Sequence, residues 1–153
     1  MKIKLDELLK QNAANHYKMI VIVDNSSHND KIIKILEKSG FTSYNVETSI
    51  IKILEKIPPE KHKLRIGDKI KDCFNSLPHK NIFFNTNILY SPDLGKLNPV
   101  NAFKYKARDR ELIVFAAGKL NGNKIQYSEH GLPDYNEIDV SEFISIKLED
   151  IDA

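Results

Sequence analysis

Residues 19–40, MIVIVDNSSHNDKIIKILEKSG, form the stretch from which the fold is best predicted. The continuous apolar run Met19–Val23 predicts a central strand of a parallel sheet that is covered on both faces. The polar residues 24–29 predict a loop. Apolar residues then recur at helical spacing until Gly40, so an amphipathic helix is expected next. Its buried stripe is predicted to consist of Ile32, Ile35 and Leu36.

A strand, a loop and a helix in this order also surround the phosphate-binding loop of many nucleotide-hydrolysing proteins. That loop runs G-x-x-x-x-G-K-[ST], with backbone N–H groups cradling the phosphates and a lysine on the β and γ oxygens. At its four defining positions this chain has Asp24, Asn29, Asp30 and Lys31. Two carboxylates would then face a triphosphate, so the sequence predicts the position of a nucleotide site without its chemistry.

The loop residues also have a structural explanation, which we favour. Asp30 in the first helical turn would complement the helix dipole, and Asn29 or Ser27 would cap the helix. The alternative is weak nucleotide binding, with Lys31 as a displaced phosphate ligand. Lys31 stands one residue late in the motif, so its side chain would point about 100° away from that of the usual lysine.

The rest of the chain continues the alternation of strands and helices. Further strands are predicted at residues 41–46, 82–84, 112–117 and 143–148, and helices at residues 2–12, 48–57, 60–77 and 98–108. Asn121-Gly122 predicts a hairpin turn. The strand at residues 82–84 ends at Asn85, where P-loop NTPases carry an acid that helps to hold Mg²⁺. Asn85 has no charge and cannot hold the metal in the same way.

Composition predicts one soluble globular domain over residues 1–153, with 41% hydrophobic and 29% charged residues. Apolar runs such as Met19–Val23 are far shorter than the roughly 20 residues of a membrane span. The first residues carry acids and lack the apolar core of a signal peptide, so a cytoplasmic location is expected.

Neither a metal site nor a cofactor is predicted. Cys73 is the single cysteine, which precludes a disulfide within the chain and argues against a cysteine-based zinc site. The five histidines show no metal-ligand spacing. Cys73 falls on the apolar stripe of the helix at residues 60–77, so we expect it in the core and not as a nucleophile.

Charge is unevenly distributed. Residues 1–128 carry 22 Lys or Arg against 13 Asp or Glu, a net charge of +9, whereas residues 129–153 carry one against eight, a net charge of −7. Two basic segments stand out, one between Lys61 and Lys71 and one between Lys104 and Arg110. Such segments can attract nucleic acid or an acidic partner, although a solvated surface is the commoner explanation.

The segment NIFFNTNILYSPDLGKLNPVNAFKYKARDRELIVFAAGKLNGNKIQYSEHGLPDYNEI, residues 81–138, resembles the BrxF family, the small P-loop-containing proteins of type 3 bacteriophage exclusion (BREX) systems. It is similar to that family's strand with an Asp-Asn pair, its DP-x-L-x-L-DP segment and its S-R-N-R-T turn. The family tail, T-Y-x-E-x-G-x-P-x-Y, is matched here by Q-Y-S-E-H-G-L-P-D-Y at residues 126–135. The resemblance covers roughly residues 12–140, and the first third fits in layout but not in motif.

The resemblance implies a minimal additional-strand NTPase fold. We therefore predict a three-layer α/β domain of P-loop-NTPase-like (AAA/RecA) type, with flanking helices on a mostly parallel sheet. The resemblance also implies a role in antiviral defence beside a much larger ATPase, a methyltransferase and a phosphatase-like protein. It does not transfer ATP chemistry to this chain, because Asp30 and Asn85 replace the lysine and the metal-binding acid.

The resulting hypothesis is a non-catalytic accessory subunit of a BREX-type antiphage system. It would dock on the larger ATPase or on another protein of that system. The predicted docking surface consists of Lys104, Lys106, Arg108 and Arg110. The alternatives are a DNA-binding accessory protein that uses the two basic segments, and a weak ATP binder.

Overall fold

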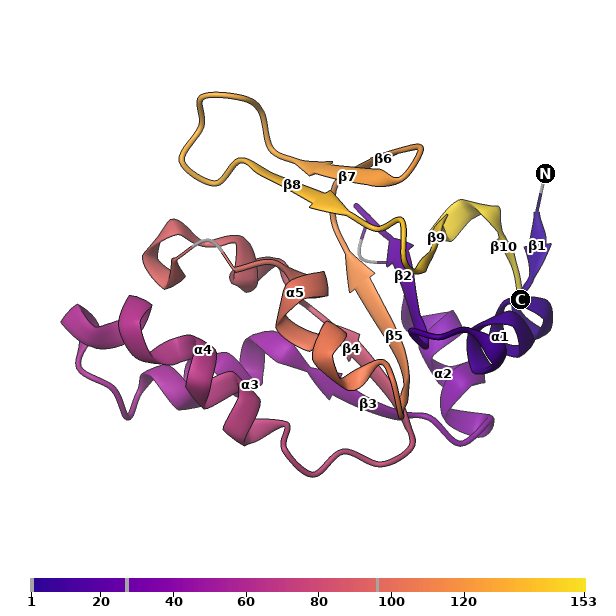
Figure 1. Ribbon diagram of the computed structural model, residues 1–153, viewed down its shortest axis with the longest axis horizontal. Coiled ribbons are helices and arrows are strands. Elements are labelled where there is room, and N and C mark those ends of the chain that lie inside the picture. Colours follow the sequence, from indigo (N-terminus) through magenta and orange to yellow (C-terminus); the bar gives the residue numbers. More distant parts are fainter. Residues whose placement is uncertain (1, 27, 96) are drawn as a thin grey trace.

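The computed structural model describes residues 2–26, 28–95 and 97–153. Its centre is a five-stranded sheet in which all neighbouring strands are parallel (Figure 1). The strands lie in the order β3 (Thr42–Asn45), β4 (Lys80–Phe84), β5 (Glu111–Ala116), β2 (Met19–Val23) and β9 (Ile144–Lys147). The predicted α/β class is confirmed, and all five predicted strands form within a few residues of their expected positions.

The strand β2 lies inside the sheet, between β5 and β9. Met19 is opposite Leu112 of β5, and Ile20 is opposite Ile144 of β9. All five residues of β2 are buried. A parallel strand covered on both faces needs apolar side chains at every position, which is why this strand reads as an unbroken apolar run.

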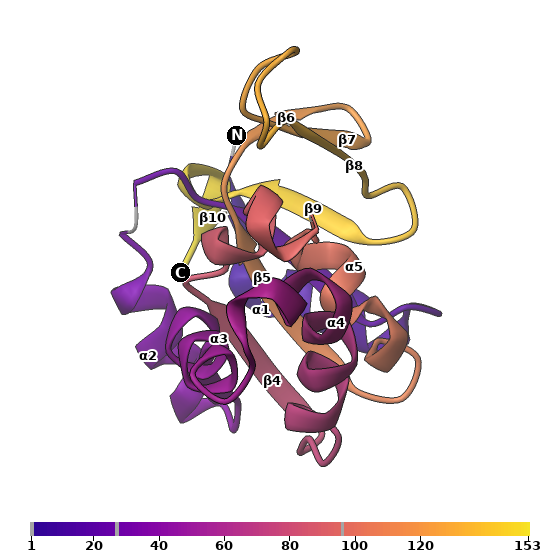
Figure 2. The same ribbon diagram turned by 90° about the vertical axis from the view of Figure 1, so that its left-hand side faces the viewer.

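Two cores lie on opposite faces of the sheet, because successive strand residues point to opposite sides. Met19, Val21 and Val23 contribute to one core, and Ile20 and Ile22 to the other. In Figure 2, α3, α4 and α5 lie in front of β4 and β5. The first core is covered by α3 (Val46–Leu54), α4 (His62–Cys73) and α5 (Pro99–Phe103), and the second by α1 (Leu5–Ala14) and α2 (Asp30–Lys38).

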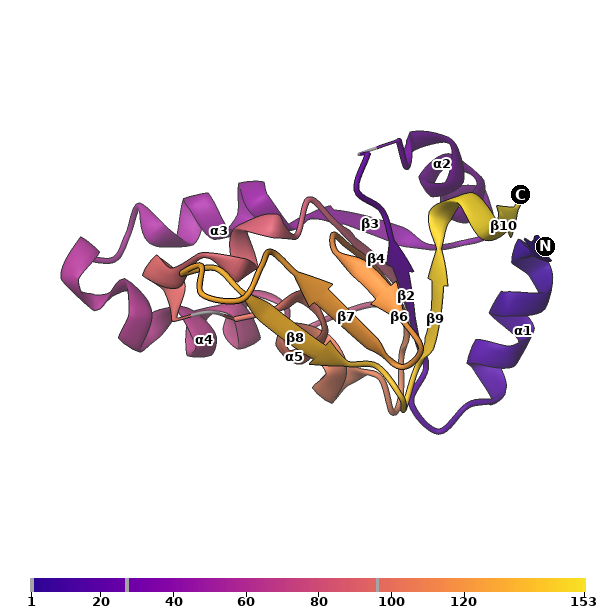
Figure 3. The same cartoon turned by 90° about the horizontal axis from the view of Figure 1, so that it is seen from above.

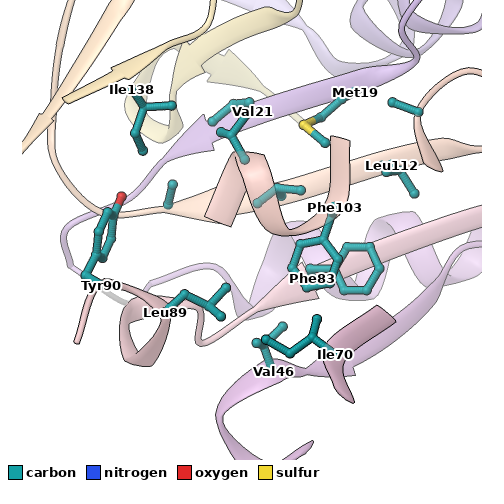
Figure 4. Close-up of a cluster of buried hydrophobic side chains, with 14 of the residues drawn as sticks. Met19, Val21, Val46, Ile70, Phe83, Leu89, Tyr90, Phe103, Leu112 and Ile138 are labelled. Atoms are coloured by element: carbon teal, nitrogen blue, oxygen red, sulfur yellow. The ribbon is translucent and has the colours of Figure 1, made fainter. Parts of the chain in front are cut away.

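Two stacked phenylalanines attach α5 to the sheet. Phe103 of α5 and Phe83 of β4 are both fully buried, and their ring centres lie 3.9 Å apart with an interplanar angle of 9° (Figure 4). Phe74, just after α4, meets both rings edge-on at 5.4 Å. The cluster therefore joins two helical segments to the central sheet.

Several helix boundaries differ from the predicted ones because of capping. The Asn45 side chain accepts a hydrogen bond from the Thr48 backbone N–H at 3.2 Å, so α3 begins earlier than residue 48. Asn98 caps α5 in the same way, through the Asn101 N–H at 2.8 Å. This helix ends at Phe103, and a short 3-10 turn, η4 (Lys104–Lys106), follows. The other 3-10 turns are η1 (Pro59–Lys61), η2 (Asn87–Tyr90), η3 (Pro92–Leu94) and η5 (Leu148–Asp150).

A small antiparallel sheet packs on the first core. It consists of β6 (Lys119–Asn121), β7 (Lys124–Tyr127) and β8 (Asn136–Asp139), and it lies above the main sheet in Figure 1. The predicted Asn121-Gly122 turn joins β6 to β7, whereas β8 was not predicted. Ile125 and Ile138 are buried and belong to the first core.

The two ends of the chain pair with each other. The strands β1 (Ile3–Lys4) and β10 (Ile151–Asp152) are parallel neighbours, so the marked ends lie close together in Figure 3. Because residues 3 and 4 are extended, the first helix begins at Leu5 and not at residue 2. Over the described ranges, no helix is both long and apolar enough to cross a membrane.

Candidate functional site

The carboxyl ends of β2 and β5 meet at one edge of the main sheet, the edge at which open α/β sheets bind their ligands. A cavity of about 570 Å³ opens there. Its walls are the loop after β2 (residues 24–26), the turn at Gly118 with the strand β6 that follows it, and residues 147–149, where β9 ends and η5 begins. This cavity with its surrounding loops is the candidate functional site.

The side chain of Asn25 fastens the loop to the turn after β5. Its Nδ2 donates to the Gly118 carbonyl oxygen at 2.7 Å, and its Oδ1 accepts from the Gly118 N–H at 2.8 Å. The Asp24 N–H donates to the Ala116 carbonyl at 2.9 Å. The loop is therefore held by a turn about 90 residues further along the chain.

The carboxylate of Asp24 acts as an internal anion for the loop. Its Oδ1 accepts hydrogen bonds from the Ser26 backbone N–H at 3.0 Å and from the Ser26 hydroxyl at 2.9 Å. In a phosphate-binding loop, such N–H groups point at the phosphate. Here a carboxylate of the same chain takes this donor.

Asn25→Ala is expected to lower the free energy of unfolding by about 1–2 kcal/mol, because it removes both hydrogen bonds to Gly118. For a chain of this length the melting temperature should fall by roughly 2–8 °C, which thermal unfolding followed by circular dichroism would measure. Asn123→Ala is the matched control, since Asn123 is an exposed residue of the neighbouring β6–β7 turn. Equal melting temperatures for the two variants would contradict the role given to Asn25.

The other residues of the predicted nucleotide loop, Asn29, Asp30 and Lys31, are not among the residues that line this cavity. Asp30 opens α2, so its charge lies in the first turn as predicted. Capping by Asn29 is wrong: its backbone is helical (φ −100°, ψ −1°), and its side chain makes no capping hydrogen bond. A capping residue normally needs an extended backbone to turn its side chain toward the helix. Ser27 lies outside the described residues, and Lys31 is exposed on α2.

The residues at the end of β4 form hydrogen bonds that hold the fold together. Asn85 has a left-handed backbone (φ 53°), and its carbonyl accepts the Glu47 N–H at 3.1 Å. The next residue, Thr86, is 2% exposed, and its hydroxyl donates to the Phe115 carbonyl at 2.6 Å. Thr86 thus ties the chain just after β4 to β5. Thr86 was not among the predicted site residues, because its partner is 29 residues away and no local motif marks it.

The cavity contains charges of both signs. Lys119 and Lys147 line it together with Asp24 and Glu149. A triphosphate site needs a concentration of positive charge, which this balance does not supply. Among the residues that the structure describes, none form a group of three or more His, Cys, Asp or Glu that could hold a metal ion.

The predicted docking surface of four cations lies at the opposite edge of the sheet and is partly structural. The Arg110 Nε donates to the Leu77 carbonyl at 3.0 Å, and the Lys106 Nζ donates to the Asn75 carbonyl at 3.4 Å. These two side chains hold the connection between α4 and β4. The exposed members of the four are Lys104 and Arg108.

The predicted basic face between Lys61 and Lys71 is divided in the structure. Arg65 and Lys69 line a groove of about 540 Å³ between α3 and α4, whereas Lys71 approaches the Tyr105 ring. From α3, Lys52 and Lys56 line the same groove. The groove therefore has four cations along it, and the remaining residues include Ile53, Ile57 and one acid, Asp72.

Cys73 is exposed and also lines this groove, so its predicted place in the core is wrong. The core stripe of α4 consists of Ile66 and Ile70, and it continues through Phe74. Partial burial raises the pKa of the Cys73 thiol, which lowers the fraction of reactive thiolate at neutral pH.

Comparisons of the chain with protein-family models, with curated proteins and with solved structures found no match. The basis for a functional proposal is therefore the geometry of the two sheet edges.

Proposed function

We propose that this chain is a catalytically inactive, P-loop-like domain that serves as an accessory subunit of a BREX-type antiphage defence system. It docks on a partner protein of that system, such as the larger ATPase. The observation that carries the proposal is the self-contained loop. Asn25 binds Gly118, and Asp24 binds Ser26, so groups that would hold a phosphate are used within the chain.

The strand order supports the P-loop-like assignment. Among the five strands of the main sheet, β2 comes first along the chain, β4 third and β5 fourth, yet β5 lies between β2 and β4 in the sheet. The name additional-strand NTPase refers to an extra strand in the sheet. This strand lies between the one that precedes the phosphate loop and the one that ends at the metal-binding acid. The same order is found here around the loop at residues 24–29 and around Asn85.

The side chains around that edge support the absence of catalysis. Phosphoryl transfer depends on cations placed around the phosphates, and on a metal ion held by an acid. Here Asp30 stands at the lysine position, and Asn85 stands at the acid position. Thr86, beside it, is occupied by its hydrogen bond to the Phe115 carbonyl.

The groove between α3 and α4 supports docking. Four cations line it, beside the apolar side chains of Ile53 and Ile57. The pair α3 and α4 extends from one side of the molecule in Figures 1 and 3, with Leu64 80% exposed. Apolar area beside four cations and a single acid, Asp72, suits an acidic, partly apolar segment of a partner protein.

Thermal unfolding with and without Mg-ATP tests the proposal. We expect no change in melting temperature beyond that caused by an equal ionic strength of MgCl₂ and NaCl. A nucleotide at about 100 times its dissociation constant would add about 2.7 kcal/mol of stability. That corresponds to a rise of roughly 5–10 °C for a domain of this size, and a rise of this kind would overturn the proposal.

The double variant Asp30→Lys, Lys31→Thr is the companion measurement, because it restores the cation and the hydroxyl of the motif. It should still show no ATP hydrolysis above the buffer background, since the loop glycines are missing and Asp24 still faces the loop. Measurable turnover would show that the closed loop is no obstacle to catalysis.

A further inference from the structure

A second cleft, of about 360 Å³, opens at the edge of the main sheet opposite the loop. Its walls come from three segments that lead into parallel strands: Tyr17 precedes β2, Arg108 precedes β5, and Phe143 precedes β9. The other lining residues are Lys104, Tyr105 and Glu142. Because these strands run parallel, three distant segments meet at one edge.

A partly exposed tyrosine ring in this cleft is flanked by two ammonium groups. Tyr105 is 39% exposed, and the Nζ atoms of Lys71 and Lys106 lie 5.7 and 5.5 Å from the centre of its ring. Lys71 comes from α4 and Lys106 from η4, so two elements bring charge to one ring. Both ammonium groups lie over the ring, as cation–π contacts. Single-stranded nucleic acids stack their bases on exposed rings among cations, so a base that stacks on Tyr105 would displace an ammonium group from the ring face toward the phosphates.

The second tyrosine of the cleft carries an arginine. The Arg108 guanidinium carbon lies 5.6 Å from the centre of the Tyr17 ring, and its Nη2 donates to the Tyr17 hydroxyl at 3.4 Å. This hydrogen bond raises the pKa of the Arg108 guanidinium. Lys18 lies beside it, with its Nζ 3.3 Å from the Arg108 carbonyl oxygen. A planar cation held on a ring in this way is suited to a phosphate or to a base plane.

Acidic and basic side chains gather on different sides of the cleft. On one side of Lys104, the acids Glu137, Asp139 and Glu142 line a neighbouring cavity. On the other side, cations prevail, and Asp109 is paired with Arg110 at 3.0 Å. These cations are Lys18, Lys71, Lys106, Arg108 and Arg110. Glu142 also lines the cleft itself, so a polyanion would run along its Tyr105 and Arg108 wall, away from Glu137 and Asp139.

We propose that this cleft binds single-stranded nucleic acid, with a base stacked on Tyr105 and the backbone phosphates on the exposed cations Arg108, Lys71 and Lys104. An acidic protein would need the cations but not the tyrosine ring. In a duplex, the bases are already stacked on one another, so only the charges would act. The shared chemistry of DNA and RNA strands is an unpaired base beside a phosphate.

Fluorescence anisotropy with the full chain tests this directly. The probes are labelled oligo-dT and oligo-U of about 15 nucleotides, within the range of known site sizes, and a mixed-sequence DNA duplex of the same length. We expect the single strands to bind more tightly than the duplex. With three phosphate contacts, the slope of log affinity against log salt should be about −2, a loss of roughly 20-fold between about 50 and 200 mM salt.

Variants separate stacking from charge. Tyr105→Ala should weaken binding of the single strands roughly 5- to 150-fold, the effect of losing one stacked base, whereas Tyr105→Phe should bind like the wild type. Arg108→Ala should make the salt slope shallower by about 0.7. Tyr135→Ala is the matched control, because Tyr135 lies outside the cleft, just before β8, and losing its ring should leave binding unchanged.

Each outcome bears on the proposal. Tighter binding of oligo-dT or of oligo-U than of the duplex supports it and shows which kind of strand is preferred, and equal binding of the two strands supports it with the strand read by charge and stacking alone. Equal affinity for the duplex, or wild-type affinity in Tyr105→Ala, overturns it. If Arg108→Ala weakens binding while Tyr105→Ala does not, the surface is a general polyanion surface, as an acidic protein would use, and the proposal is lost.

Discussion

Gly118→Ala is expected to destabilise the protein by about 3–5 kcal/mol, through a clash and through backbone strain. A Cβ atom on Gly118 would lie 2.6 Å from the Cγ2 of Ile125 and 2.8 Å from the carbonyl oxygen of Gln126. Its φ of +142° is one that residues with a side chain rarely adopt. The backbone at this position also forms both hydrogen bonds to Asn25, so any shift would release the loop.

Thermal unfolding would show this as a fall in melting temperature of roughly 6–20 °C. Gly122→Ala is the matched control in the same hairpin. Gly122 also has a positive φ, of +59°, but a Cβ atom there meets nothing within 4 Å. Its cost should be about 1 kcal/mol, from the left-handed backbone alone. Similar losses in the two variants would show that the close approach of Gly118 to β7 does not constrain position 118.

Phe103→Ala should cost about 3–5 kcal/mol, because it removes a fully buried ring and leaves a cavity against Phe83. Phe74, which meets the same ring, would lose a contact as well. The measurement is urea unfolding, in which the midpoint should fall while the slope is kept.

Phe103→Leu is the matched variant, since it keeps apolar volume and loses only the stacked geometry. Its cost should be roughly 1–1.5 kcal/mol. Phe103 directly precedes η4, which carries Tyr105, so the alanine variant should also weaken binding of oligo-dT while the leucine variant should not. Full stability of Phe103→Ala would contradict the anchoring of α5 on β4.

The elements predicted correctly are those in which local pattern and burial agree. Met19–Val23 is apolar at every position because both faces are covered, so its sequence alone defines it. The strand β8 has the sequence NEID, in which Ile138 is the buried residue, and its pairing with β7 supplies the structure that its sequence does not indicate. Cys73 fitted the apolar spacing of its helix, but the buried stripe ends in Phe74 and leaves Cys73 on the groove side.

The position of the candidate site could be predicted from the sequence, but the hydrogen bonds that hold the site together could not. The polar loop after β2 and the neutral Asn85 follow from the order of residues. The bonds between Asn25 and Gly118, and between Arg108 and Tyr17, join residues 93 and 91 positions apart. Such contacts depend on which strands become neighbours, and a single sequence contains no local signal for that. The number of free cations on the predicted docking surface was overestimated for the same reason. The carbonyls that bind Lys106 and Arg110 belong to the segment between α4 and β4, about 30 residues earlier in the chain.

The position of β2 between β5 and β9 has a consequence for the making of the chain. The ribosome delivers Met19–Val23 early, whereas the neighbouring strands, Glu111–Ala116 and Ile144–Lys147, follow about 90 and about 120 residues later. At a synthesis rate of about 5–20 residues per second, the first of these neighbours arrives roughly 4–18 s after β2. Until then Met19–Val23, an uncharged apolar run with β-branched residues at four of its five positions, has no neighbouring strand to pair with. Such a segment is prone to aggregation. A strand that is fully buried in the finished protein is therefore exposed during translation, when a chaperone or the early helices must protect it.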